Sequence, residues 1–262
     1  MRSKDVLGIV NILIVAGVLG AISYAALVLQ PPEYDPNTLC LSGEQPAHMA
    51  LVIDKTDLYS PEQARRIETL VLDSRDRLDI GERLSLYELD ARGELINTNS
   101  FSLCNPGRGD QINPLYRNPA RVEARYQALF EGPLQSALAD LVEPKESPAS
   151  PIIEALADLA LEEEFDPRTP RRTVVLVSDM LQNSRLFSVY GRARSDLANR
   201  LPPPARVAAL VEDEYGDVLA GVRIEIYLIE RRGWSAEDRA ILQAYWSEVF
   251  RQLGVREEWR AL

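Results

Sequence analysis

The sequence predicts an α/β domain with a doubly wound, mostly parallel β-sheet and a single antiparallel edge strand. Short apolar runs alternate with helix-like segments along most of the chain, and one pair of runs is joined by a hairpin-like turn. Apolar runs of this kind are typical of parallel strands that helices cover on both faces. Ligands of such sheets bind beyond the carboxyl ends of the strands, so a functional site is expected there.

The elements follow in order along the chain. The predicted strands are residues 48–54, 83–89, 98–103, 173–178 and 222–229. The predicted helices are residues 61–78, 119–141, 151–163, 192–201 and 236–253. Ser60 and Pro61 form a helix start, with a capping hydroxyl and a proline in the first turn. Residues 90–94 predict the hairpin, and the proline triplet at residues 202–204 predicts extended chain.

The N-terminal segment has the composition of a membrane anchor. Residues 6–29 carry no charged side chain, and a helix of this length crosses a bilayer core of about 30 Å. Arg2 and Lys4 precede this stretch, and no Lys or Arg follows it before Lys55. The positive-inside rule therefore predicts a single-pass protein of the bacterial inner membrane, with its C-terminal domain in the periplasm or outside the cell. A cleaved signal peptide is the alternative.

This interpretation divides the chain into three parts. Residues 1–30 form a cytoplasmic stub and the transmembrane anchor, residues 31–46 a linker, and residues 47–262 the α/β domain. Small residues at four-residue spacing in the anchor would also allow two such helices to associate into an oligomer.

Cysteine content and charge limit the function. Cys40 and Cys104 are the two cysteines, and an oxidising compartment would allow them to pair; two free buried thiols are the alternative. There is no CxxC spacing that would indicate zinc. A formal net charge of −11 argues against nucleic acid as a partner.

Polar residues gather where predicted strands end. Asp54 and Asp179 each follow an apolar run, Thr56 lies two residues after Asp54, and Ser150 precedes a predicted helix. Carboxylates and hydroxyls from separate loops are ligands that suit a hard cation such as Mg²⁺. Each residue also has a simpler interpretation, as a helix cap or as a side chain that hydrogen-bonds its own loop.

These four positions resemble the metal-ion-dependent adhesion site of the von Willebrand factor type A (VWA) domain. That family carries Asp-x-Ser/Thr-x-Ser after its first strand, a Thr or Ser opening a helix, and an Asp after its fourth strand. The resemblance implies that Asp54, Thr56, Ser150 and Asp179 hold Mg²⁺, with Mn²⁺ or Ca²⁺ as alternatives, and that a partner protein adds an acidic side chain. The last Ser of the first motif falls on Leu58, which cannot coordinate a metal. The expected function is a membrane-anchored, extracytoplasmic protein-binding module of an envelope assembly.

Two other functions remain open. A scaffold subunit could keep the fold with a vestigial metal site. A Mg²⁺-dependent phosphatase would be similar to the haloacid dehalogenase family, but its second Asp is replaced here by Thr56, so we expect no enzyme. His48, the only histidine, is expected to pack rather than catalyse, because no Ser/His/Asp set forms around it. The loop at residues 105–118 is either a recognition loop or an irregular connection.

Overall fold

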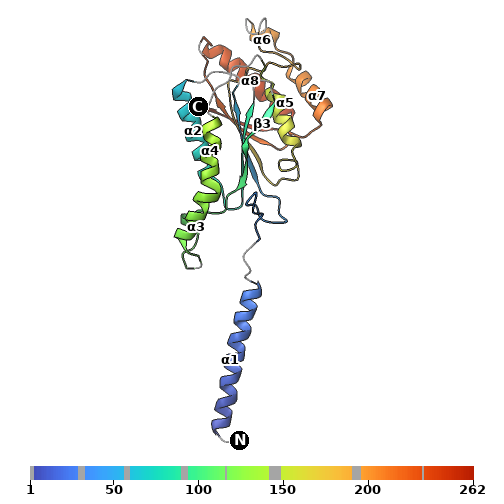
Figure 1. Cartoon of the computed structure of the whole chain (residues 1–262). Coiled ribbons are helices and arrows are strands. Elements are labelled where there is room, and N and C mark those ends of the chain that lie inside the picture. Colours follow the sequence, from blue (N-terminus) through green and yellow to red (C-terminus); the bar gives the residue numbers. More distant parts are fainter. Residues whose placement is uncertain are drawn as a thin grey trace. The chain divides into compact units, whose positions relative to one another are not determined.

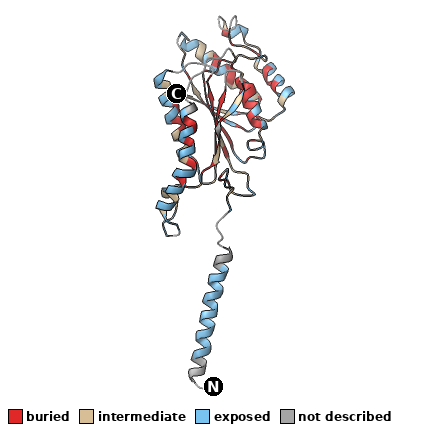
Figure 2. Cartoon of the chain, in the orientation of Figure 1, coloured by how far each residue is buried: buried red, intermediate tan, exposed pale blue. Residues whose placement is uncertain are grey.

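A computed structural model describes residues 3–28, 33–55, 60–89, 94–115, 117–141, 149–190, 196–231 and 233–262. The chain divides into two compact units, Met1–Tyr34 and Asp35–Leu262. The first unit is the helix α1, Ser3–Val28, whose described side chains are exposed (Figure 2). The sequence predicts a transmembrane anchor here; in the described part of the chain, no helix is long and apolar enough to cross a membrane.

The second unit is built on a six-stranded sheet in the order β3-β2-β1-β4-β5-β6 (Figure 1). The strands are β1 His48–Asp54, β2 Arg83–Leu89, β3 Leu95–Cys104, β4 Arg172–Ser178, β5 Arg223–Leu228 and β6 Arg256–Ala261. Only β3 runs antiparallel, and it lies at one edge of the sheet. The predicted fold class, a mostly parallel α/β sheet with one antiparallel edge strand, is confirmed.

Helices cover both faces of this sheet. They are α2 Pro61–Asp76, α3 Pro119–Tyr126, α4 Gly132–Leu141, α5 Ile152–Leu161, α6 Leu197–Arg200, α7 Pro204–Tyr215 and α8 Ala236–Gln252. Alternate residues of β1 point to opposite faces: Leu51 and Ile53 pack with α2 and α4, whereas Ala50 and Val52 pack with α5, α7 and α8. Figure 1 shows these two helical layers on either side of the strands. Burial on both faces explains why the central strands are apolar runs without alternation.

Three elements differ from the sequence prediction. The helix predicted over residues 119–141 is interrupted by a π-helical segment, Gln127–Glu131. The proline triplet is not extended throughout, because Pro204 begins α7; a proline fits the first helical turn, where its missing N–H is not needed. The strand β6 was not predicted. Part of the helix predicted over residues 192–201 lies outside the described residues.

A disulfide joins Cys40 to Cys104, with 4.9 Å between the two Cα atoms and a sequence separation of 64 residues. The backbone N–H of Cys104 also donates to the carbonyl of Thr38 at 2.8 Å. The segment that precedes β1 is therefore attached to the end of the edge strand β3.

Candidate functional site

The candidate site lies at the carboxyl edge of the sheet, between β1 and β4. The chain order of the strands reverses at this point, which makes it the topological switch point where α/β sheets bind ligands. β1 ends at Asp54, and β4 ends at Ser178, which Asp179 follows. Both carboxylates are nearly buried, with 3% of Asp54 and 6% of Asp179 exposed. Buried carboxylates need polar partners or a cation, so their surroundings define what the site can do.

The carboxylate of Asp54 is the centre of a small hydrogen-bond network. Its Oδ2 accepts a hydrogen bond from Ser178 Oγ at 2.8 Å and another from Ser150 Oγ at 3.1 Å. Ser150 is held in place by paired backbone hydrogen bonds with Asn183, of 3.0 and 2.8 Å. Hydroxyl groups from two other segments of the chain thus meet at the Asp54 carboxylate.

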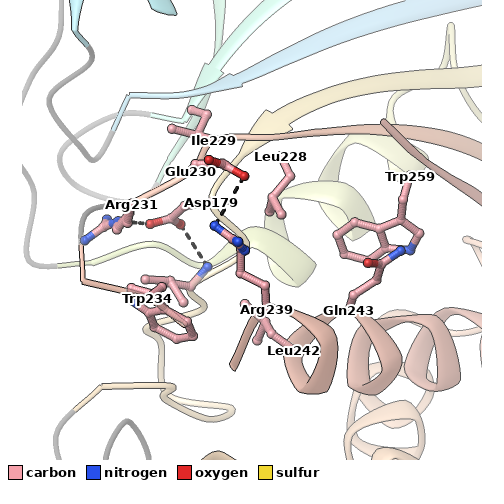
Figure 3. Close-up of a pocket in the computed structure, with 11 residues that line it drawn as sticks. Asp179, Leu228, Ile229, Glu230, Arg231, Trp234, Arg239, Leu242, Gln243 and Trp259 are labelled. Atoms are coloured by element: carbon pink, nitrogen blue, oxygen red, sulfur yellow. Dashed lines mark hydrogen bonds and ion pairs between the residues drawn. The ribbon is translucent and has the colours of Figure 1, made fainter. Parts of the chain in front are cut away.

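Asp179 connects the end of β4 to the loop that follows β5. Its Oδ1 accepts a hydrogen bond from the backbone N–H of Leu181 at 2.9 Å, and its Oδ2 forms an ion pair with Nε of Arg231 (Figure 3). The next residue, Met180, adopts a left-handed backbone with φ of 61°. At this turn the Met180 carbonyl accepts a hydrogen bond from the indole N–H of Trp246 in α8, at 2.9 Å. A core tryptophan therefore fixes the backbone beside the site.

Arg231 brings a positive charge to this edge. Burial lowers the pKa of its guanidinium, and the nearby negative charge of Asp54 opposes that effect. The guanidinium carbon also lies 6.0 Å from the ring centre of Tyr190. Beside the site, the buried Lys55 donates to Glu88 Oε2 at 2.8 Å. Two ion pairs thus lie near the end of β1, Arg231 with Asp179 and Lys55 with Glu88.

A small cavity of about 20 Å³ adjoins the ion pair between Asp179 and Arg231. Its wall is mainly apolar, and its other lining residues are Leu181, Leu228, Ile229, Glu230, Trp234, Arg239, Leu242, Gln243 and Trp259. Figure 3 shows Glu230 paired with Arg239 across this wall, at 3.2 Å. Charged and apolar groups therefore lie side by side at the edge.

The structure brings together part of the set that the sequence indicates. Asp54 and Ser150 are in direct contact, and Asp179 follows the adjacent strand. Thr56 lies outside the described residues, as does Leu58. Ser150 does not cap α5, because the cap position is Pro151 and the Ser150 hydroxyl is used on Asp54.

Two residues of the site, Ser178 and Arg231, were not predicted from the sequence. Ser178 could have been found, because it is a hydroxyl residue at the end of an apolar strand. No local sequence pattern marks Arg231, because Asp179 follows β4 whereas Arg231 follows β5, and their contact depends on how the chain folds. Asp54 does not cap α2; Ser60 does, with Gln63 completing a capping box.

The donor set suits a hard cation in its chemistry, since it offers carboxylate and hydroxyl oxygens. Within the described ranges, no three His, Cys, Asp or Glu side chains form a group that could hold a metal ion. A cation at this edge would accordingly be coordinated by hydroxyl as well as carboxylate oxygens, and it would lie close to the positively charged Arg231.

Comparison with known proteins gives structural likenesses only. No family model matches the chain, and no curated protein sequence matches it. An aerotolerance-related membrane protein from Bacteroides fragilis is 11% identical with a TM-score of 0.38, covering 82% of this chain and 91% of that one. BatB from Bacteroides thetaiotaomicron is 12% identical with a TM-score of 0.35, covering 82% and 90%. The manganese-loaded TRAP protein of Plasmodium vivax is 13% identical with a TM-score of 0.37, covering 76% and 63%. Because these values are low, function is inferred from the site itself.

Proposed function

We propose that the carboxyl edge of the sheet is a protein-binding site of the VWA kind. Asp54, Thr56, Ser150 and Asp179 would hold Mg²⁺ or Mn²⁺, and a partner protein would complete the coordination with an acidic side chain. One observation carries the proposal. At the topological switch point, the Asp54 carboxylate accepts hydrogen bonds from the hydroxyls of Ser150 and of Ser178, the last residue of β4. A binding role is proposed rather than an enzymatic one.

The proposal includes a place of action outside the cytoplasm, as part of an envelope assembly. The disulfide between Cys40 and Cys104 supports this location, because disulfides persist in oxidising compartments and are rare in the cytosol. The acidic character of the chain, at −11, supports a protein rather than a nucleic acid as the partner.

A second candidate is a scaffold subunit that works without a metal. The ion pair between Asp179 and Arg231 favours it, because the guanidinium already provides a positive charge at the edge. In this case the edge would be a fixed part of the fold, and a partner would dock elsewhere or without a cation.

Metal titration of the full chain separates these candidates. Thermal unfolding and calorimetry are measured with Mn²⁺ and Mg²⁺ for the wild type, Asp54→Asn and the control Asp213→Asn, which changes an exposed carboxylate of α7. The metal-dependent module predicts stabilisation that Asp54→Asn abolishes and Asp213→Asn retains. Millimolar ions without effect on the wild type would favour the scaffold. Affinity capture of membrane-fraction proteins with and without EDTA then shows whether partner binding depends on the metal.

A further inference from the structure

The strand β6 lies at an edge of the sheet, and among the described strands it pairs only with β5. The backbone N–H of Arg256 donates to the Val222 carbonyl at 2.9 Å. Because the backbone groups of a strand alternate in direction, the even-numbered residues of β6 direct theirs to β5. The N–H and C=O groups of Glu257, Trp259 and Ala261 therefore point outward, as a row with which a further strand can pair.

The side chains of β6 divide between the two faces of the sheet. Trp259 is half-buried against the core on the α8 side, and its indole N–H donates to Ser247 Oγ at 3.1 Å (Figure 3). The charged side chains of Arg256, Glu258 and Arg260 lie on the opposite face, because side chains alternate along a strand. On that face a cavity of about 340 Å³ separates the end of β6 from α2. The charged face of β6 is therefore accessible to a partner strand.

The charges of β6 are complementary to those of a second copy that runs in the opposite direction. If a twofold axis passes through Trp259, Glu258 of each chain lies opposite Arg260 of the other. These are non-hydrogen-bonded pairs, in which opposing residues of an antiparallel ladder are closest. Opposite charges at such positions stabilise the pairing, whereas like charges destabilise it.

The other axis positions fit less well. An axis through Glu258 would place Arg256 opposite Arg260 of the second copy, and Glu258 opposite itself, which charge repulsion disfavours. An axis through Glu257 would place that carboxylate opposite its copy and would pair the end of β6 with residues 253 and 254, which precede the strand. Only the axis through Trp259 pairs all of residues 257–261 within β6.

Two features of the single chain add to this pairing. Within one chain, Arg260 already pairs with Glu258 at 3.0 Å and lies 3.8 Å from Glu225. The carboxylate of the second copy would extend these contacts into a network, which contributes more than an isolated exposed ion pair. Trp259 would lie beside its copy at the axis, and aromatic residues are enriched at the centres of interfaces.

We propose that β6 is a homodimer interface, in which two copies of the chain join their six-stranded sheets through antiparallel β6 strands about an axis at Trp259. The inference goes beyond the proposed binding role and does not depend on a metal. Such a twofold interface is closed, and it removes the exposed β6 edge from unrelated strands.

The test compares dimer dissociation constants, measured by sedimentation equilibrium of the full chain in a density-matched detergent. The detergent covers the exposed apolar side chains of α1, and any association of α1 is common to all variants. Glu258→Arg and Arg260→Glu each place like charges opposite one another, so each should weaken the dimer at least about tenfold. Arg256→Glu is the matched control on the same face of β6; it faces Leu262 of the second copy and should change the constant less than about twofold.

Mixing the two single variants gives the decisive measurement. In Glu258→Arg both positions are positive, and in Arg260→Glu both are negative, so each variant complements the other. The equimolar mixture should form a heterodimer about as tight as the wild-type dimer, within about threefold. The double variant Glu258→Arg/Arg260→Glu should likewise associate with itself again. An association through α1 alone would not follow this pattern.

Three results would overturn the inference: a wild type that stays monomeric at every concentration, reversal variants that dimerise like the wild type, and folded variants that do not recover on mixing. Loss of the dimer in Arg256→Glu but not in Arg260→Glu would overturn the axis at Trp259. If Arg260→Glu does not fold beside Glu225, Arg260→Gln replaces it. Its mixture with Glu258→Arg should associate more tightly than Glu258→Arg alone, and no gain on mixing would again contradict the inference.

Discussion

Lowering the pH should destabilise this protein through one residue, His48. The imidazole is buried at the start of β1, where Nδ1 donates to the Glu164 carbonyl at 2.8 Å and Nε2 lies 2.7 Å from Ser85 Oγ. The edge of the Phe165 ring lies against it, with 5.0 Å between the ring centres. Burial, the largest effect, lowers the pKa of His48 from 6.5 to about 4, and the charge of Arg83 adds to that shift.

The sign follows from proton binding. The unfolded chain takes up the proton near pH 6.5, whereas the folded chain resists it until about pH 4. The stabilising effect of neutral His48 is therefore complete above pH 6.5 and is lost progressively as the pH falls toward 4. One pH unit in this window is worth ~1.4 kcal/mol, so lowering the pH from about 7.5 to about 5 should remove ~2 kcal/mol of the free energy of unfolding.

Urea unfolding of the disulfide-intact chain, followed by circular dichroism at several pH values, measures this loss. Carboxylates titrate in the same range, so the comparison is made with His48→Gln, which removes the only histidine. The variant should be less stable at pH 7.5 because it loses packing and a hydrogen bond, yet its stability should fall by ~2 kcal/mol less on acidification. Parallel curves for the two proteins would refute the reasoning.

Three further predictions concern stability. Replacing Cys40 and Cys104 by serine should lower the free energy of unfolding by about 4 kcal/mol, the loop-closure entropy for a separation of 64 residues; an unchanged urea midpoint would contradict this. Lys55→Met should cost about 3–5 kcal/mol because buried Glu88 loses its lysine, and adding Glu88→Leu should recover most of the loss; no recovery in the double variant argues against the pair. Phe130→Ala should cost about 3–5 kcal/mol in thermal unfolding, since its ring is fully buried, and a loss below 1 kcal/mol would show that the core collapses around it.

Much of the fold could be predicted because its central strands are buried on both faces. The predicted bounds of β1 and β2 agree with the structure, since apolar runs bounded by polar turns leave little choice of strand ends. β6 escaped prediction because an edge strand needs few apolar residues, and Arg256–Ala261 carries four charged side chains among its six residues. α7 escaped because its three leading prolines suggested extended chain, although Pro204 fits a first helical turn.

The site was predictable only where topology alone brings residues together. Asp54 and the end of β4 must lie near each other once the two strands are neighbours. Ser150 directly precedes α5, and a helix that leads into β4 begins at this same edge of the sheet, so its position near Asp54 could also be predicted. The ion pair of Asp179 with Arg231 depends on the path of a loop that carries no pattern. Side chains that reach a site from such loops require the three-dimensional structure.

The covalent link between Cys40 and Cys104 also determines how this chain would respond to mechanical force. A pull applied to its two ends bypasses everything between the two cysteines, because the link closes that segment into a loop. The segment contains β1, α2, β2 and nearly all of β3. At about 3.4 Å for each extended residue, a span of 64 residues removes ~220 Å from the length to which the chain can be stretched. Half of the sheet would therefore stay looped under tension, while the later strands and helices extend.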